Sequence, residues 1–160
     1  MNKQHVLQQI IETLKVDLDV ATRAAQTAYE TATHEENIAE NKYDTLGLEA
    51  SYLAAGQARR VEEIRHSLVL YQKLVLEPYD EQRGIQSGDL ITLESAHGVQ
   101  QHLFLGPDAA GLKVRHEHIL ITVITAKAPL GQNLIGKFDG DELEISVNGA
   151  RQSFEITQIL

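Results

Sequence analysis

The first half of the chain repeats small or apolar residues at alternating intervals of four and three positions. Two separate runs carry this repeat, and a polar residue interrupts the second run once. The first run is Leu7, Ile11, Leu14, Leu18, Ala21, Ala25, Ala28 and Ala32, and the second is Ala50, Ala54, Gln57, Val61, Ile64, Leu68, Tyr71 and Val75. This spacing is typical of a coiled-coil seam. Because no proline precedes Pro78, we predict two long helices.

The two seams match each other when the chain folds back on itself, with Leu7 opposite Val75 and the bend near Asn41. An oligomeric coiled coil would carry the same repeat, but this match favours an antiparallel hairpin within one chain, with its tip between Glu36 and Asp44. Seam residues are large at the base and almost all alanine towards the tip, which predicts a tapered finger. At about 1.5 Å rise per residue, each arm would be about 45 to 50 Å long.

Short apolar runs with a period of two replace this pattern in the second half, which predicts strands. The runs cover 90–93, 101–105, 118–124, 142–147 and 152–159, and a short helix is expected over 129–135. The predicted fold class is therefore α+β with two domains. Residues 1–77 form an antiparallel coiled-coil helical hairpin, which we call the finger, 78–84 form a linker, and 85–160 form an antiparallel β-sheet domain with a short helix.

Composition excludes several classes of protein. The 160 residues contain no Cys, which rules out disulfides and thiolate zinc sites and favours a cytoplasmic location. A net charge of −9 argues against tight, independent binding to nucleic acid. The chain has no run of about 20 apolar residues, and its first residues do not form a basic segment followed by an apolar one. We therefore expect no membrane span and no secretion signal. Without an HExxH motif, a Gly-flanked nucleophile or a phosphate-binding loop, independent hydrolase or nucleotide-binding chemistry has no support.

Acidic residues gather at the predicted tip of the finger. Residues 30–49 contain six acidic residues and one lysine, whereas the rest of 1–76 has five acidic and seven basic residues. An ordinary solvated loop is one interpretation. The other is that the tip carries carboxylates for a hard cation such as Mg²⁺, which prefers oxygen ligands and takes few from any one protein. A lone hairpin would then complete a site that belongs to a partner.

Two segments of the sequence resemble the bacterial Gre transcript-cleavage factors. The more specific segment is Ala128-Pro129-Leu130-Gly131-Gln132-Asn133-Leu134-Ile135-Gly136-Lys137 followed by Gly140-Asp141-Glu142-Leu143-Glu144, which looks like the family's serine-proline, short helix, Leu-Ile-Gly-Lys and Gly-Asp region. Around the tip, Glu36-Asn37, Ala39-Glu40 and Tyr43 look like a loosened form of the family's Glu-Asn-Ala-Glu-Tyr. The resemblance covers nearly the whole chain.

The resemblance implies an accessory factor of bacterial RNA polymerase, which is not itself an enzyme. The C-terminal domain would be FKBP-like and would dock on the rim of the polymerase's secondary channel through Ala126, Pro129 and Leu130. The finger would enter the channel, where tip carboxylates help the polymerase to cleave the 3′ end of backtracked nascent RNA. The catalytic candidates are Glu36, Glu40 and Asp44, and Glu40 and Asp44 are the expected ligands of a Mg²⁺ shared with the polymerase active site.

The tip departs from the family's pattern, in which an Asp is followed three positions later by Glu. His34 lies near the expected Asp, and Asp44 with Glu49 is a second acidic pair. Because relatives without a proper acidic pair bind polymerase without stimulating cleavage, the alternative function is a non-cleaving regulator or inhibitor at the secondary channel. An FKBP-like fold also suggests a prolyl isomerase, but Phe104, Phe138 and Phe154 are too few aromatic residues for such a pocket.

Two further groups of residues have two interpretations each. Arg59, Arg60 and Arg65 form either a basic patch that faces RNA or ordinary surface pairs with neighbouring acids such as Glu62 and Glu63, and the two interpretations carry equal weight. On the strand predicted here, His116 and His118 would point to one face. That arrangement suggests a metal site, but without a third ligand a plain surface pair is favoured.

Overall fold

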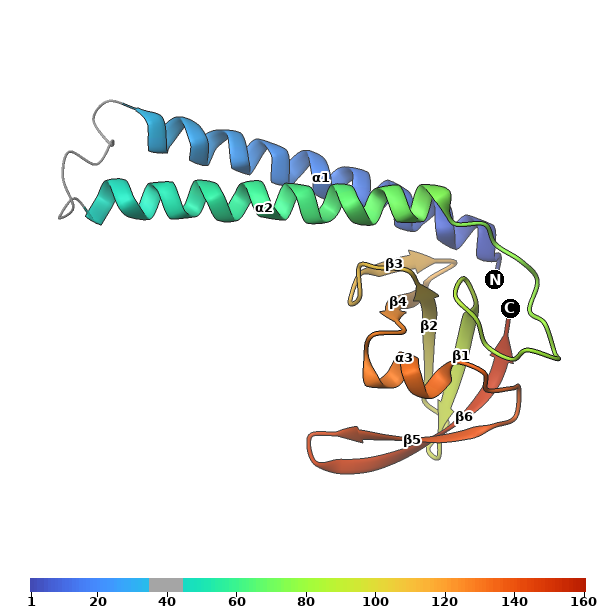
Figure 1. Cartoon of the computed structure of the whole chain (residues 1–160). Coiled ribbons are helices and arrows are strands. Elements are labelled where there is room, and N and C mark those ends of the chain that lie inside the picture. Colours follow the sequence, from blue (N-terminus) through green and yellow to red (C-terminus); the bar gives the residue numbers. More distant parts are fainter. Residues whose placement is uncertain (35–44) are drawn as a thin grey trace. The chain divides into compact units, whose positions relative to one another are not determined.

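The computed structural model describes residues 1–34 and 45–160, apart from the side chains of Leu46 and Val147 (Figure 1). The chain divides into two compact units. One unit comprises Glu12–Val69 and is called the helical unit. The other comprises Met1–Ile11 together with Leu70–Leu160 and is called the sheet unit.

Two long helices, α1 (Lys3–Thr33) and α2 (Thr45–Lys73), run antiparallel, as the hairpin prediction required (Figure 1). Asn2 caps α1, because its side-chain oxygen accepts hydrogen bonds from the backbone N–H groups of Gln4 and His5 at 3.0 and 3.1 Å. Among the described residues of the helical unit, the buried apolar side chains all belong to the predicted seams: Leu14, Ala21, Ala28, Val61, Ile64 and Leu68. The seam expected to reach Val75 ends earlier, since α2 stops at Lys73 and Val75 is 77% exposed.

A six-stranded sheet with the order β3-β4-β2-β1-β6-β5 forms the sheet unit. The strands are β1 (Leu90–Ser95), β2 (Gln100–Gly106), β3 (Lys113–His116), β4 (Ile119–Thr125), β5 (Glu142–Val147) and β6 (Ala150–Ile159). The α+β class is confirmed, with one correction. The sheet is mixed rather than antiparallel, because β2 pairs with β4 in parallel while the other described pairings are antiparallel.

Both faces of the central strands are buried. Ile91, Leu93, Leu103 and Leu105 belong to a core cluster that also contains Leu134 of the short helix α3 (Pro129–Leu134). Alternate residues of the same strands point to the opposite face. Leu90 and Phe104 are buried there. This two-sided burial explains why the strands appear in the sequence as nearly continuous apolar runs.

Residues from the ends of both helices complete the sheet unit. Val6 and Ile10 are fully buried, and Lys3 forms an ion pair with buried Asp89 at 3.1 Å. The Tyr71 ring lies 6.4 Å from that of Phe104, and its hydroxyl donates a hydrogen bond of 2.7 Å to the Asp108 carbonyl. Burial, with a smaller contribution from Asp108, raises the pKa of Tyr71 well above its usual value. Tyr71 is therefore a packing residue of the sheet unit as well as a seam position.

Candidate functional site

The predicted tip of the finger lies largely outside the described residues. Glu36, Glu40 and Asp44, the candidate catalytic residues and Mg²⁺ ligands, all fall in 35–44. Two acidic residues near the tip are described. Glu30 accepts a hydrogen bond from the Gln26 side chain at 2.9 Å, and Glu49 is exposed near the start of α2.

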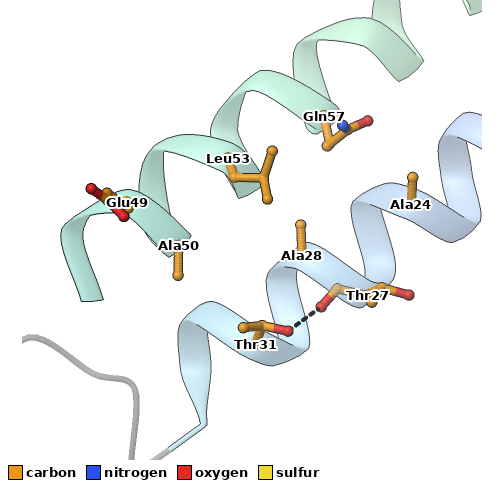
Figure 2. A pocket seen from close by; sticks show the side chains of 8 residues that line it. All are labelled: Ala24, Thr27, Ala28, Thr31, Glu49, Ala50, Leu53 and Gln57. Atoms are coloured by element: carbon orange, nitrogen blue, oxygen red, sulfur yellow. Dashed lines mark hydrogen bonds between the residues drawn. The ribbon is translucent and has the colours of Figure 1, made fainter. Parts of the chain in front are cut away.

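Alanines leave a shallow groove along the outer part of the helical unit. The groove has a volume of about 500 Å³. Figure 2 shows Ala28 pointing from α1 towards Leu53 of α2, with Glu49 and Gln57 on the same side of α2. A second groove, of about 450 Å³, is lined by Ala54 and other residues. Leu53 lines the first groove and its neighbour Ala54 lines the second, so these two positions of α2 face different grooves beside the seam. Short seam side chains thus leave open space beside the seam in the outer part of the helical unit.

The three arginines of the predicted basic patch are all exposed on α2, but they point in different directions. At about 100° per residue, Arg59 points away from the seam, while Arg60 and Arg65 flank it on opposite sides. Arg60 lies 3.9 Å from Glu63, and Arg65 pairs closely with Glu62. These pairs match the surface-contact interpretation for Arg60 and Arg65. No ion pair of Arg59 is seen within residues 1–34 and 45–160.

The predicted partner-binding residues of the sheet unit lie just before α3 and in its first turn. Ala126 and Pro129 are exposed, whereas Leu130 is half-buried against the core cluster. The start of α3 packs closely against the end of β4, because a Cβ on Gly131 would lie 1.9 Å from the Thr125 carbonyl oxygen. Gly131 therefore allows α3 to approach the end of β4 closely, which holds Ala126 and Pro129 in a defined position.

His116 and His118 do not form the surface pair that the sequence favoured. His116 is the last residue of β3 and is buried, whereas His118 is exposed in the turn that leads to β4. Glu117 and His118 both have positive φ, 51° and 68°, so the turn breaks the strand alternation on which the prediction rested. Across the described part of the chain, no three His, Cys, Asp or Glu side chains are grouped so that they could hold a metal ion.

Sequence reasoning missed two structural features near the start of α1. Lys3 and Asp89 are 86 positions apart, and Asp89 also accepts a hydrogen bond from the Gln86 backbone N–H at 2.8 Å. The His5 ring lies edge-on to that of His116, with 6.0 Å between the ring centroids. Neither pairing has a local sequence signal, because periodicity identifies a buried face but not its distant partner.

The described residues define an α+β protein that combines a long two-helix hairpin with a six-stranded mixed sheet. No helix among them is long and apolar enough to span a membrane. No protein-family model and no curated protein matches the chain.

Solved structures that are similar to the chain include Gfh1 and GreA/GreB proteins. Crystal structures of GreA factor homolog 1 (Gfh1) from Thermus thermophilus and of Gfh1 from Thermus aquaticus are 20% and 23% identical to it, with TM-scores of 0.40 and 0.41. The matches cover 98% of this chain in both cases and 93% and 92% of those chains. The prokaryotic transcription elongation factor GreA/GreB from Nitrosomonas europaea is 18% identical, with a TM-score of 0.40, over 60% of this chain and 78% of that chain.

Proposed function

We propose that this protein is a cytoplasmic accessory factor of bacterial RNA polymerase that acts through the secondary channel. The observation that carries the proposal is that one hairpin combines a seam whose residues become smaller towards the predicted tip with a concentration of acidic residues around that tip. Ala21 and Ala28 are the buried α1 positions in the outer part of the helical unit, and residues 30–49 carry a net charge of −5. A long two-helix hairpin with small seam residues and negative charge at its predicted tip is suited to bringing carboxylates to a partner's active site.

The segment with the more specific Gre resemblance supports the same proposal. Its residues fold into α3 and β5, with Pro129 at the first turn of α3 and Gly136 in a positive-φ conformation after it. In the proposed complex, Ala126, Pro129 and Leu130 contact the polymerase, and Arg59 is the arginine best placed to face RNA. Arg60 and Arg65 already have carboxylate neighbours.

The proposed activity is stimulation of the polymerase's own cleavage of backtracked RNA. Glu36, Glu40 and Asp44 would provide the carboxylate oxygens that Mg²⁺ prefers, with Glu40 and Asp44 as its ligands. Bound Mg²⁺ supplies Lewis acidity and an activated water in such reactions. The role of this chain is to position those carboxylates beside the polymerase active site, so the protein has no nuclease activity alone.

A second candidate function is a non-cleaving regulator of the same channel. The specific observation that favours it is the absence from this tip of an Asp followed three positions later by Glu, with His34 near the expected Asp. Both functions require binding to polymerase, and they differ in what happens to the RNA.

The test is cleavage of 5′-labelled RNA in a stalled, backtracked polymerase complex with Mg²⁺. We expect the wild-type protein to accelerate 3′ shortening and the variant Glu40→Ala plus Asp44→Ala to lose this stimulation while binding equally well. The matched control is Glu12→Ala plus Asp19→Ala, which removes the same charge from exposed positions of α1 far from the predicted tip and should remain active. Binding without stimulation would establish the regulator instead, and stimulation that survives in the tip variant would exclude Glu40 and Asp44 as the ligands.

Docking is tested separately by Ala126→Glu, which places a charge on the proposed contact surface. The control, Ala96→Glu, makes the same change at an exposed position in the turn between β1 and β2. We expect only the first substitution to weaken binding to polymerase. Equal binding by both variants would contradict the proposed docking segment, and no binding by the wild-type protein would contradict the proposed function.

A further inference from the structure

Strand β6 extends past the strand beside it, which leaves a notch in the sheet unit. The pairing of β1 with β6 ends at Ser95 and Phe154, whereas the residues of β6 before Phe154 pair with β5 alone. Figure 1 shows the β5–β6 hairpin projecting beyond β1. The notch is a cavity of about 470 Å³ between the β1–β2 turn and the first residues of β6. A cavity of this volume is in the usual range of ligand pockets.

The side of β6 that borders the notch carries unpaired backbone groups. The turn 148–149 has two residues, both with positive φ, so the residues that flank it form a hydrogen-bonded pair. Because the direction of hydrogen bonding alternates along an antiparallel strand, Arg151 and Ser153 direct their N–H and C=O groups away from β5. Ile156 agrees with this alternation, since its backbone bonds to the segment that leads into β5. Within the described residues, no backbone group from the β1 side pairs with Arg151 or Ser153.

The wall opposite β6 is ordered. The Ser95 hydroxyl oxygen accepts hydrogen bonds from the backbone N–H groups of His97 and Val99 at 3.3 and 3.2 Å, which fixes the β1–β2 turn. The outer strands of the sheet, β3 and β5, also have an open edge, but exposed charged side chains such as Arg115 and Glu144 discourage pairing there. The notch is recessed between two walls, so it is the edge best suited to receive a further strand.

Side chains around the notch indicate which segment fits it. Successive side chains of a strand point to opposite faces, so Phe154 lies on the core face of β6 and Arg151 on the other. Phe154 and the exposed Val99 supply apolar lining. Arg151 is 83% exposed, and its pair with Glu144 at 3.6 Å is a weak surface contact. None of the described residues that line the notch is acidic.

We propose that the notch binds an extended segment of a partner protein, which adds to the sheet as a strand beside β6. In this segment apolar and acidic residues alternate. Its backbone pairs with Arg151 and Ser153, its apolar side chains cover Phe154 and Val99, and its carboxylates meet the Arg151 guanidinium. Charge complementarity selects this occupant, because the notch has a cation and no carboxylate. In strand addition the main chain supplies affinity, and alternate side chains supply specificity.

This site is separate from the proposed contact with polymerase. β2 begins beside the notch, where Gln101 lines the cavity, and it ends at Gly106 beside Thr125, the last residue of β4. Ala126 directly follows Thr125. The notch and the proposed polymerase contact therefore lie at opposite ends of the central strands.

The test is titration of the full chain with a short capped peptide of alternating valine and glutamate, followed by ¹⁵N–¹H NMR. We expect saturable shifts and slower hydrogen exchange of the Arg151 and Ser153 backbone amides. Two control peptides separate the contributions. One has lysine in place of glutamate, and the other has methylated backbone nitrogens. Each should bind about tenfold more weakly or worse.

Variants test the same site from the side of the protein. Arg151→Glu and Ala96→Glu each add a negative charge to an exposed position of the notch and should weaken binding of the glutamate peptide about tenfold. The matched controls are Arg115→Glu, on the exposed edge strand β3, and Ala126→Glu. Both controls should bind the peptide as well as wild type does.

The proposal is overturned if the wild-type protein shows no saturable binding, if either control peptide binds as well as the glutamate peptide, or if Arg151→Glu binds as well as wild type. Shifts of the Arg151 and Ser153 amides that depend on protein concentration without peptide would also overturn it, because a second copy of the chain would then occupy the notch. Ala126→Glu should disturb only polymerase binding and Ala96→Glu only peptide binding, so the two proposals can fail independently.

Discussion

Gly106 and Tyr71 provide a direct test of the packing inside the sheet unit. A Cβ added at Gly106 would lie 2.0 Å from the Tyr71 hydroxyl oxygen and 2.9 Å from the ring carbon that carries it. The tyrosine is fully buried, and its hydroxyl donates to the Asp108 carbonyl, so it has no free space into which to move. Gly106 is not among the glycines with positive φ, and an alanine there would suffer from the contact alone.

We expect Gly106→Ala to lower the free energy of unfolding by about 2 to 4 kcal/mol. Overpacking a core costs about 1 to 3 kcal/mol, and displacing Tyr71 also loses a hydrogen bond of about 1 kcal/mol. Tyr71→Phe alone should cost about 1 kcal/mol for that hydrogen bond. In the Tyr71→Phe background, Gly106→Ala should cost less, because the contact at 2.0 Å no longer exists and the nearest neighbour is the ring carbon at 2.9 Å.

The assay is urea denaturation of the four proteins in this double-mutant cycle, followed by far-ultraviolet circular dichroism. We expect a coupling energy of about 1 kcal/mol or more, within the range found for residues in contact. Additive costs, with coupling below about 0.3 kcal/mol, would refute the placement of the Tyr71 hydroxyl against Gly106. A coupling of the opposite sign would do the same, since it would mean that the hydroxyl does not create the clash.

Two further predictions concern single positions. Gly56→Ala should raise the free energy of unfolding by about 0.5 to 1 kcal/mol in the same urea assay, because Gly56 lies inside α2 with nothing within 4 Å of an added Cβ. A loss of stability would show that this space is filled. Burial lowers the pKa of His102, so its contribution to stability is present above its ordinary pKa of 6.5 and is lost as the pH falls below that value. His102→Gln should therefore reduce the decline in melting temperature between pH 7 and pH 5. An unchanged decline in the variant would contradict this role of His102.

The helices were predictable because their signal is local and redundant. Many seam positions agree on the same period, so the exposure of Val75 did not change the overall assignment. The four residues of β3 alternate as Lys113, Val114, Arg115 and His116, with one apolar residue, and this pattern is too short to indicate a strand. The parallel pairing of β2 with β4 was missed for a related reason. Once β3 is overlooked, nothing in the sequence shows that β4 returns beside β2 in the same direction.

The chemistry of the candidate site was less predictable than the fold. Tyr71 fits the helical repeat, yet its ring packs against Phe104 of the sheet, because a repeat defines a face and not the partner of that face. Arg59, Arg60 and Arg65 are close in sequence but diverge around the helix. His116 and His118 would share a face in a continuous strand, but two consecutive positive φ angles separate them. Each difference arises from three-dimensional context that neighbouring residue types do not encode.

Side-chain size and charge change in the same direction along the finger, and the proposed function accounts for both. Burial of a Leu or Ile side chain contributes about 1.5 to 3 kcal/mol, so replacing such residues by Ala21 and Ala28 reduces the stability of the outer helix pair. The acidic residues of 30–49 reduce it further through mutual repulsion. A hairpin that only docked at the rim of a channel would gain from neither feature. A hairpin that must carry carboxylates through a narrow opening needs small side chains to pass and negative charge at its tip.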